Sequence, residues 1–432
     1  MIKEGRQKLN KLWSSKVKEE IYIEKLENGL TVFIIPKKNT SKKYVILGTE
    51  FGSIDNHFIL DGNEIIVPDG IAHYLEHKLF EQKNGKNSLD VLSSLGVEAN
   101  AYTTNNHTAF LFETTENFYS ALDEFMDYIQ NPYFTDENVE KERGIIGQEI
   151  KMYDDYPDWR VYFNAIQAMY KDNPIKIDVV GTVNTIEKID KNMLYTIYKA
   201  FYMPNNMALV LSGDFIVEDI IKEVKKRIKP KEENHITKRI YPVEQDEILK
   251  NCIEEYKDIS KPIFIIGYKD KVNEENKVKK DISIEIIANI IAGKSSSLYQ
   301  RLYEQGLISS EFSFNYEYAK TYSHILFQNT SNDPKKVLEE FENEVNFYFE
   351  QGFNNDDFER IKNKIYGEYV RRYNNVSDIA DDVLINHFKG INSFDFLDEC
   401  AKLDKQYVEM IFKQVFKKDR IVLSIVYPKN KD

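Results

Sequence analysis

Two stretches of this chain occur twice, and this repetition limits the folds that the sequence can adopt. Residues 134–149 line up with residues 353–368 without a gap, and residues 207–212 resemble residues 420–424. An internal repeat indicates one scaffold that is built twice. Since strand and helix patterns alternate within each copy, the sequence predicts an α+β fold of two homologous domains, each an antiparallel sheet packed against helices.

The domain boundaries follow from a segment between the two copies. Residues 231–244 are rich in charged residues, with Pro230 in front of them and Pro242 near their end. This composition is typical of an interdomain linker. We therefore expect one domain at residues 1–230 and a second at residues 245–432.

Only the first copy carries a pattern of metal-binding residues. Residues 71–80 form an apolar run without proline, which predicts a helix. His73 and His77 are then at positions i and i+4 on one helix face, where two imidazoles can hold a metal ion. Glu76 shares this face and can reach a metal-bound water. The order H-x-x-E-H is the inverzincin motif.

The alternative is a chance arrangement on a buried helix. Two imidazoles on an otherwise apolar helix would then need polar partners, because a buried polar group without one costs about 1–3 kcal/mol. The chain has only seven histidines, so chance seldom produces this order. A metal ion would supply the partner.

Composition argues against several other classes of protein. A net charge of −13 disfavours nucleic-acid binding, which requires a basic surface. The N-terminal residues lack the apolar segment of a signal peptide, and no stretch reaches the length of a membrane span, so we expect a cytoplasmic protein without a membrane partner. Cys252 and Cys400 form neither a disulfide framework nor a C-x-x-C site, as in a reducing compartment.

Two further segments bear on the motif. Residues 99–104 and 109–113 have the pattern of two strands joined by a short loop. A helix is predicted to start near Asp136 and to run to about Tyr153. Glu142 and Glu149 are nearly two helical turns apart within it, so both carboxylates project from the same face.

With these features the sequence resembles the pitrilysin/insulinase family of zinc peptidases over nearly its whole length. The resemblance rests on His73-x-x-Glu76-His77, on the pair Glu142 and Glu149, on Asn100-Ala-Tyr-Thr and on a second half without the motif. Residues 70–81 and 148–160 look closest to the bacterial YmfH-type single-chain members. The family's fold implies that this chain forms half of a clam-like peptidase shell.

The resemblance also implies the roles of individual residues. His73, His77 and Glu149 would bind one Zn²⁺ per chain and leave a fourth position for water. Glu76 would be the catalytic base. Glu142 would be an outer carboxylate that orients a histidine through its free N–H. A surface role for Glu142 is the alternative.

A substrate-binding strand follows from the same resemblance. Asn100, Ala101, Tyr102 and Thr103 would bind a peptide by strand addition along an exposed edge. The alternative is a strand that pairs only within the protein. His107 receives no role.

One departure from the family concerns the second half. Family members usually carry an Arg and a Tyr there, in a segment like Leu-Arg-x-x-x-Gly-Leu-x-Tyr, that help to bind the substrate carbonyl. Tyr303 and Ser309 occupy those two places here. Arg301, Tyr316 and Tyr318 are candidates to replace the pair, and spacing leaves the choice open.

The function implied is that of a zinc-dependent endopeptidase that hydrolyses short unfolded peptides inside a chamber of two chains, with peptide maturation or leader removal as a cellular role. The chain would dimerise with itself or with a homologous chain that carries the Arg/Tyr pair. A non-catalytic subunit or peptide-binding scaffold of such a heterodimer is the alternative. A zinc-stabilised structural domain is weaker, because it leaves Glu76 without a purpose.

Overall fold

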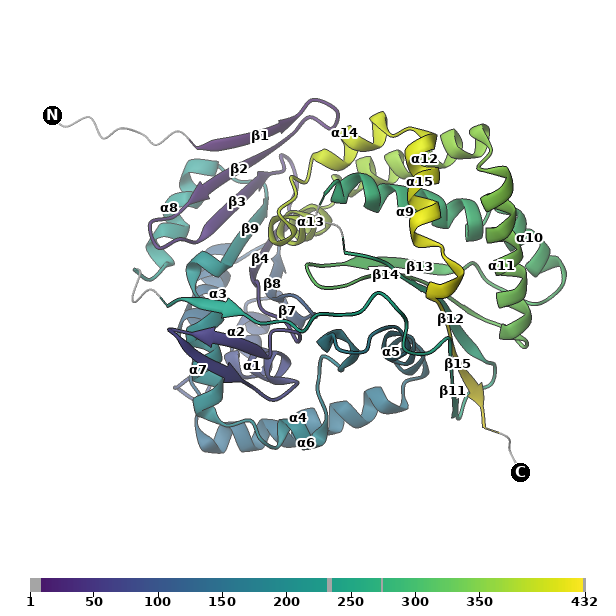
Figure 1. The fold of residues 1–432 in the computed structure, drawn as a ribbon. Helices are drawn as coiled ribbons and strands as arrows, with labels where there is room; N and C mark the ends of the chain where they lie inside the picture. The colour runs from purple at the N-terminus through teal and green to yellow at the C-terminus, as the bar shows by residue number, and fades with distance from the viewer. Residues whose placement is uncertain (1–8, 231–234, 273–274, 430–432) are drawn as a thin grey trace. The chain divides into compact units, whose positions relative to one another are not determined.

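The computed structural model describes residues 9–230, 235–272 and 275–429. The chain divides into two compact units, which are described separately here (Figure 1). Unit 1 comprises Met1–Gly147, Val179–Ile240 and Val370–Phe394, and unit 2 comprises Gln148–Asp178, Tyr241–Tyr369 and Asp395–Asp432.

Unit 1 is built on a seven-stranded sheet of order β1-β2-β3-β9-β4-β8-β7. Its strands are β1 (Asn10–Ser14), β2 (Glu19–Lys25), β3 (Thr31–Pro36), β4 (Lys43–Thr49), β7 (Glu98–Thr103), β8 (Thr108–Thr114) and β9 (Met207–Gly213). Every residue of β9 is buried, as its apolar sequence predicts, and the strand returns to the sheet between β3 and β4.

Eight helices of four or more residues contribute to unit 1 within the described part of the chain. They are α1 (Ile71–Leu79), α2 (Ser88–Ser94), α3 (Phe118–Gln130), the first part of α4 (Asp136–Asp155), α6 (Val183–Ile186), α7 (Lys191–Phe201), α8 (Val217–Arg227) and α13 (Val376–Lys389). The 3₁₀ helix η2 (Pro204–Asn206) precedes β9.

A small sheet of order β10-β5-β6 completes unit 1. It contains β5 (His57–Leu60), β6 (Asn63–Ile66) and β10 (Thr237–Arg239). Because β10 belongs to the predicted linker, part of that segment is held in unit 1 by strand pairing with β5. Residues 231–234 of the linker lie outside the described residues.

Unit 2 repeats the central arrangement with a five-stranded sheet of order β11-β15-β12-β14-β13. Its strands are β11 (Cys252–Lys257), β12 (Ile263–Lys269), β13 (Ser313–Tyr318), β14 (Ser323–Thr330) and β15 (Ile421–Pro428). Its helices are α5 (Pro157–Met169), α9 (Lys277–Ala292), α10 (Ser297–Glu304), α11 (Pro334–Gln351), α12 (Asn355–Arg372), α14 (Asp395–Lys402) and α15 (Lys405–Val415), with η1 (Pro174–Lys176) and η3 (Lys418–Arg420).

The predicted fold class is confirmed, since two sheets pack against helices, but the sheets are not purely antiparallel. β3 pairs with β9 in parallel, and β11 pairs with β15 in parallel. In both cases a long connection that contains helices separates the two strands, and such a connection permits the parallel direction. All other strand pairs in these two sheets are antiparallel.

Each compact unit contains a helix that comes from the other half of the sequence. α13, from the second half, packs on β4 and β9 of unit 1, where Tyr44 donates a hydrogen bond to Asp381 over 2.9 Å. α5, from the first half, packs on β12 and β15 of unit 2. The domain boundary at residues 231–244 is inferred from the repeat along the sequence and stays a prediction. The compact units place α13 with the first half of the sequence and α5 with the second half.

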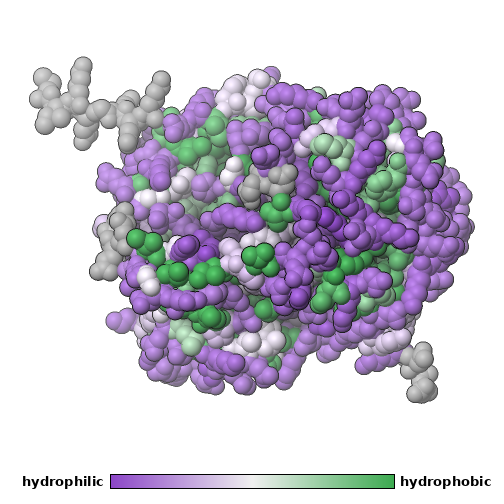
Figure 2. All heavy atoms as spheres, in the orientation of Figure 1, coloured by the Kyte–Doolittle hydropathy of each residue, from purple (hydrophilic) through white to green (hydrophobic). Residues whose placement is uncertain are grey.

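Figure 2 shows one face of the molecule, on which hydrophilic residues predominate and apolar residues occur in small groups. None of the helices within the described residues has the length and apolar character that a membrane crossing requires.

Candidate metal centre

Helix α1 presents the motif because its start is fixed by a glycine. Gly70 has a φ of 88°, and a Cβ there would lie 2.6 Å from the carbonyl oxygen of Val180. A side chain would therefore be strained both by conformation and by contact. From Ile71 onward the apolar run is helical as predicted, and nearly all of its residues are buried.

His73 and His77 of α1 lie close to Glu149 of α4. The rings of His73 and His77 are 4.5 Å apart between centroids. Potential ligand atoms of His73, His77 and Glu149 all lie within 4.8 Å of one another. Glu149 lies in the second half of α4. Elsewhere in the described part of the chain no three such side chains converge in this way.

This donor set fits zinc. Two imidazole nitrogens and one carboxylate oxygen are the protein ligands of one class of catalytic zinc site, which keeps a fourth position open. Burial, with a smaller contribution from His77, lowers the pKa of His73 to about 3. The imidazole is therefore neutral at physiological pH, as a ligating nitrogen must be.

Glu142 is hydrogen-bonded to His77, and its role as an outer carboxylate stays a prediction. His77 Nδ1 is 3.0 Å from Glu142 Oε1, and Lys78 Nζ is 3.5 Å from Glu142 Oε2. Burial raises the pKa of Glu142, but the hydrogen bond with His77 and the charge of Lys78 outweigh it, so that the net pKa is lowered. An ionised carboxylate can only accept a hydrogen bond, so His77 carries its proton on Nδ1. Its Nε2 is then the nitrogen that can bind a metal ion.

Glu76 is buried and is held from the neighbouring strand. Thr103 Oγ1 donates a hydrogen bond to Glu76 Oε2 over 2.7 Å, and it lies 3.3 Å from the hydroxyl of Thr108. Sequence reasoning assigned Thr103 to substrate binding and missed this contact. Nothing in the sequence pattern links positions 76 and 103, because only the packing of α1 beside β7 brings them together.

The predicted substrate-binding residues lie on an edge strand. Asn100, Ala101, Tyr102 and Thr103 belong to β7, which pairs with β8 at the end of the sheet. The N–H of Ala101 donates to the side chain of Asn100 over 2.9 Å. The edge position is the one that strand addition requires, and the substrate-binding role stays a prediction.

His107 and Tyr102 have a packing relationship. Their rings are 5.6 Å apart in an edge-to-face arrangement, and His107 also lies near Phe388 of α13. Burial lowers the pKa of His107 to about 4. This neutral, buried histidine fits the absence of an assigned role.

The candidates for the carbonyl-binding pair form hydrogen bonds with carboxylates of unit 2. Arg301 Nη2 donates to Glu344 Oε2 over 2.6 Å. The hydroxyls of Tyr316 and Tyr318 each donate over 3.1 Å, to Asp270 and Asp281 respectively. These hydrogen bonds hold the three side chains against carboxylates of unit 2.

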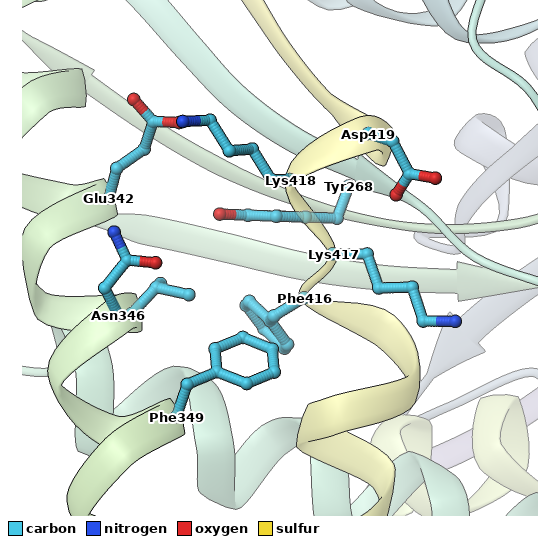
Figure 3. Close-up of a pocket in the computed structure, with 9 residues that line it drawn as sticks. Tyr268, Glu342, Asn346, Phe349, Phe416, Lys417, Lys418 and Asp419 are labelled. Atoms are coloured by element: carbon cyan, nitrogen blue, oxygen red, sulfur yellow. The ribbon is translucent and has the colours of Figure 1, made fainter.

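A separate pocket of about 470 Å³ occurs in unit 2. Figure 3 shows the rings of Phe349 and Phe416 on one side of it, and the side chains of Glu342 and Lys418 extending toward each other on another. It contains no converging set of potential metal ligands. We assign it no role in the chemistry at α1.

Known proteins match this chain along its length. The family described as Insulinase (Peptidase family M16) matches residues 67–183, and the Peptidase M16 inactive domain matches residues 188–365. The uncharacterized zinc protease YmfH of Bacillus subtilis is 36% identical over 422 residues, which cover 96% of this chain and 98% of that protein.

Solved structures agree with this match. A putative M16-like peptidase from Alicyclobacillus acidocaldarius has a TM-score of 0.91 at 30% identity and covers 95% of this chain and 99% of its own. Pitrilysin has a TM-score of 0.76 at 18% identity, covering 98% of this chain but only 46% of its own, and shows the fold alone.

Proposed function

The chain belongs to the insulinase family, peptidase family M16, and from this premise we propose that it is a zinc-dependent endopeptidase. The observation that carries the proposal is the convergence of His73, His77 and Glu149 beside the buried Glu76. The residues of the family's motif are all present, and the potential ligand atoms of His73, His77 and Glu149 converge although α1 and α4 are far apart in sequence.

Glu76 performs the proton transfers. When bound, zinc would polarise the substrate carbonyl and lower the pKa of a water molecule. Glu76 accepts the proton of that water as oxygen bonds to the carbonyl carbon, and it returns the proton to the leaving amine as the C–N bond breaks. Thr103 holds the carboxylate of Glu76 on the side of β7.

The substrate is a short, unfolded peptide. Strand addition to β7 uses main-chain hydrogen bonds, which any extended peptide can make and a folded one cannot. Maturation of small peptides or removal of a leader would present such substrates. An endopeptidase cleaves an internal peptide bond and does not need to bind the charged end of its substrate. We therefore assign no residue near β7 to the binding of a peptide terminus.

A complete site requires a second chain. This chain spans 46% of pitrilysin, and Arg301, Tyr316 and Tyr318 are bound to carboxylates of their own unit. We propose a dimer, either with a second copy or with a homologous chain that supplies the Arg/Tyr pair. A cytoplasmic location is part of the same proposal, supported by Cys252 and Cys400, which form no disulfide.

The test separates the catalytic base from the ligands. Glu76→Gln should retain zinc and the fold but lose about 10²–10⁴-fold in hydrolysis of an unstructured peptide, because an amide cannot accept the proton. Glu218→Gln, on the exposed start of α8, is the matched control and should retain full activity. A zinc-loaded protein that cleaves nothing, alone or with a homologous chain, would overturn the peptidase proposal and favour the alternative of a non-catalytic subunit or peptide-binding scaffold.

A further inference from the structure

A lysine next to the metal-binding motif is completely buried. The side chain of Lys78 has 0% of its surface exposed, although it directly follows His77 on α1. Lysine is almost never buried to this extent unless its charge is paired. The proposed chemistry does not use Lys78, so its position needs another reason.

Helix α1 has a second face, which points toward α4. Tyr74, His77 and Lys78 follow one another at the spacing of a helical stripe, and Glu81 lies just beyond the end of the helix. Tyr74 donates a hydrogen bond to the carbonyl of Val139 on α4. His77 is therefore at the border of two faces, one shared with His73 and Glu76 and the other with Lys78.

Glu142 of α4 contacts both His77 and Lys78. Its Oε1 lies 3.0 Å from His77 Nδ1, and its Oε2 lies 3.5 Å from Lys78 Nζ. Because each oxygen has its own partner, the carboxylate cannot rotate without breaking one of the two contacts. The carboxylate is itself buried, with 9% of its side chain exposed, so water offers little replacement.

We propose that Lys78 is a positioning residue of the metal centre. It holds Glu142 in the orientation that fixes the ring of His77, and through that ring it sets zinc affinity. The inference rests on the proposed zinc site and deepens it. Lys78 touches neither metal nor substrate in this role, and it acts only through Glu142 and His77.

Another part of the same network provides a matched control. Lys78 Nζ is also 2.8 Å from Glu81 Oε2, and Glu81 Oε1 is 3.6 Å from Lys141 Nζ. Lys141 has 70% of its side chain exposed and does not contact Glu142 in this way. Lys141→Met removes the same side chain and charge from the outer end of the network.

Zinc affinity of the full chain, measured by competition with a chromophoric chelator, tests the proposal. Substitution of outer partners of a ligand typically weakens metal binding about 10–100-fold. We expect Glu142→Gln to fall in this range, Lys78→Met to raise the Kd about 10-fold, and Lys141→Met to change it by less than about twofold. The double variant K78M/E142Q should bind no more weakly than E142Q, since both act through one contact.

Three results would overturn the positioning role. Zinc binding by K78M could equal that of the wild type, it could be tighter because a positive charge has left the site, or the effects of K78M and E142Q could multiply. Thermal unfolding of the metal-free variants shows whether K78M folds. If it does not, K78M/E81Q is compared with E81Q, because this pair leaves no unpartnered Glu81.

The wild type separates this inference from the proposed function. A wild-type chain that binds zinc but never hydrolyses peptide would overturn the peptidase proposal and leave the Kd series interpretable. A wild-type chain that binds no zinc would overturn both.

Discussion

The two units share one scaffold and differ at the helix position that contacts His77 in unit 1. The strand order β3-β9-β4-β8-β7 of unit 1 recurs as β11-β15-β12-β14-β13 in unit 2, with the parallel pair at the same place. In the aligned helices α4 and α12, Ile146 and Ile365 are equivalent and both are fully buried. Glu142 is equivalent to Ile361, which is also buried.

This difference shows how a scaffold accommodates chemistry. A buried carboxylate is tolerated in unit 1 because His77 and Lys78 supply two partners. In unit 2 the equivalent position is aliphatic, and the burial is ordinary core packing. The polar site is thus a local replacement within a conserved packing arrangement.

The largest expected effect concerns the ligands. His73→Ala, His77→Ala and Glu149→Gln should each abolish tight zinc binding, because each removes one of only three protein ligands. Metal analysis of the purified variants measures it. Glu368, the equivalent of Glu149 in unit 2, provides the control, and Glu368→Gln should keep a full complement of zinc. Zinc retained by all three ligand variants would exclude this set.

The missing carbonyl-binding pair should have the next largest effect. We expect weak activity of the isolated chain, and a gain of about 10²-fold when Tyr303→Arg and Ser309→Tyr restore the pair, as one preorganised donor contributes on this scale. Both positions are exposed, so the fold should tolerate the change.

Y303L/S309F is the control for this gain, since it changes size without the polar groups. Robust zinc-dependent cleavage by the unmodified chain alone would contradict the requirement for a partner. Arg301→Ala would then identify whether Arg301 serves instead.

A third prediction transfers the carboxylate between the units. Ile361→Glu should destabilise the protein by about 3 kcal/mol, because the buried charge would have no counterpart of His77 and Lys78. Chemical denaturation followed by fluorescence measures the change. Asn363→Glu, two positions further on at an exposed site of the same helix, is the control. If I361E were as stable as the wild type, a buried carboxylate on α12 would not need partners like His77 and Lys78, and the proposed difference between α4 and α12 would be wrong.

The smallest expected effect concerns the base. Thr103→Val preserves the shape of the side chain but removes the hydrogen bond to Glu76, and a bond to a charged group contributes about 1.5–3 kcal/mol. We expect kcat to fall about 10-fold with little change in KM or in zinc content. If KM rises and kcat stays constant, Thr103 binds substrate as the sequence alone suggested.

Residues close in sequence could be assigned before the structure was known. The period of an α-helix places His73, Glu76 and His77 on one face, and it does the same for Glu142 and Glu149. Strand and helix patterns within the repeat predicted the fold class, apart from the two parallel strand pairs. These features depend on geometry within one element, which is readable from the order of residues.

Tertiary structure decided the features that join separate elements. The contact of Thr103 with Glu76, the burial of Lys78 against Glu142 and the exchange of α5 and α13 each unite segments far apart in the chain. No local period specifies which segments will pack together, because that choice depends on the burial of complementary surfaces across the whole unit. The chain order therefore determined which residues could act, and packing decided which partners hold them in place.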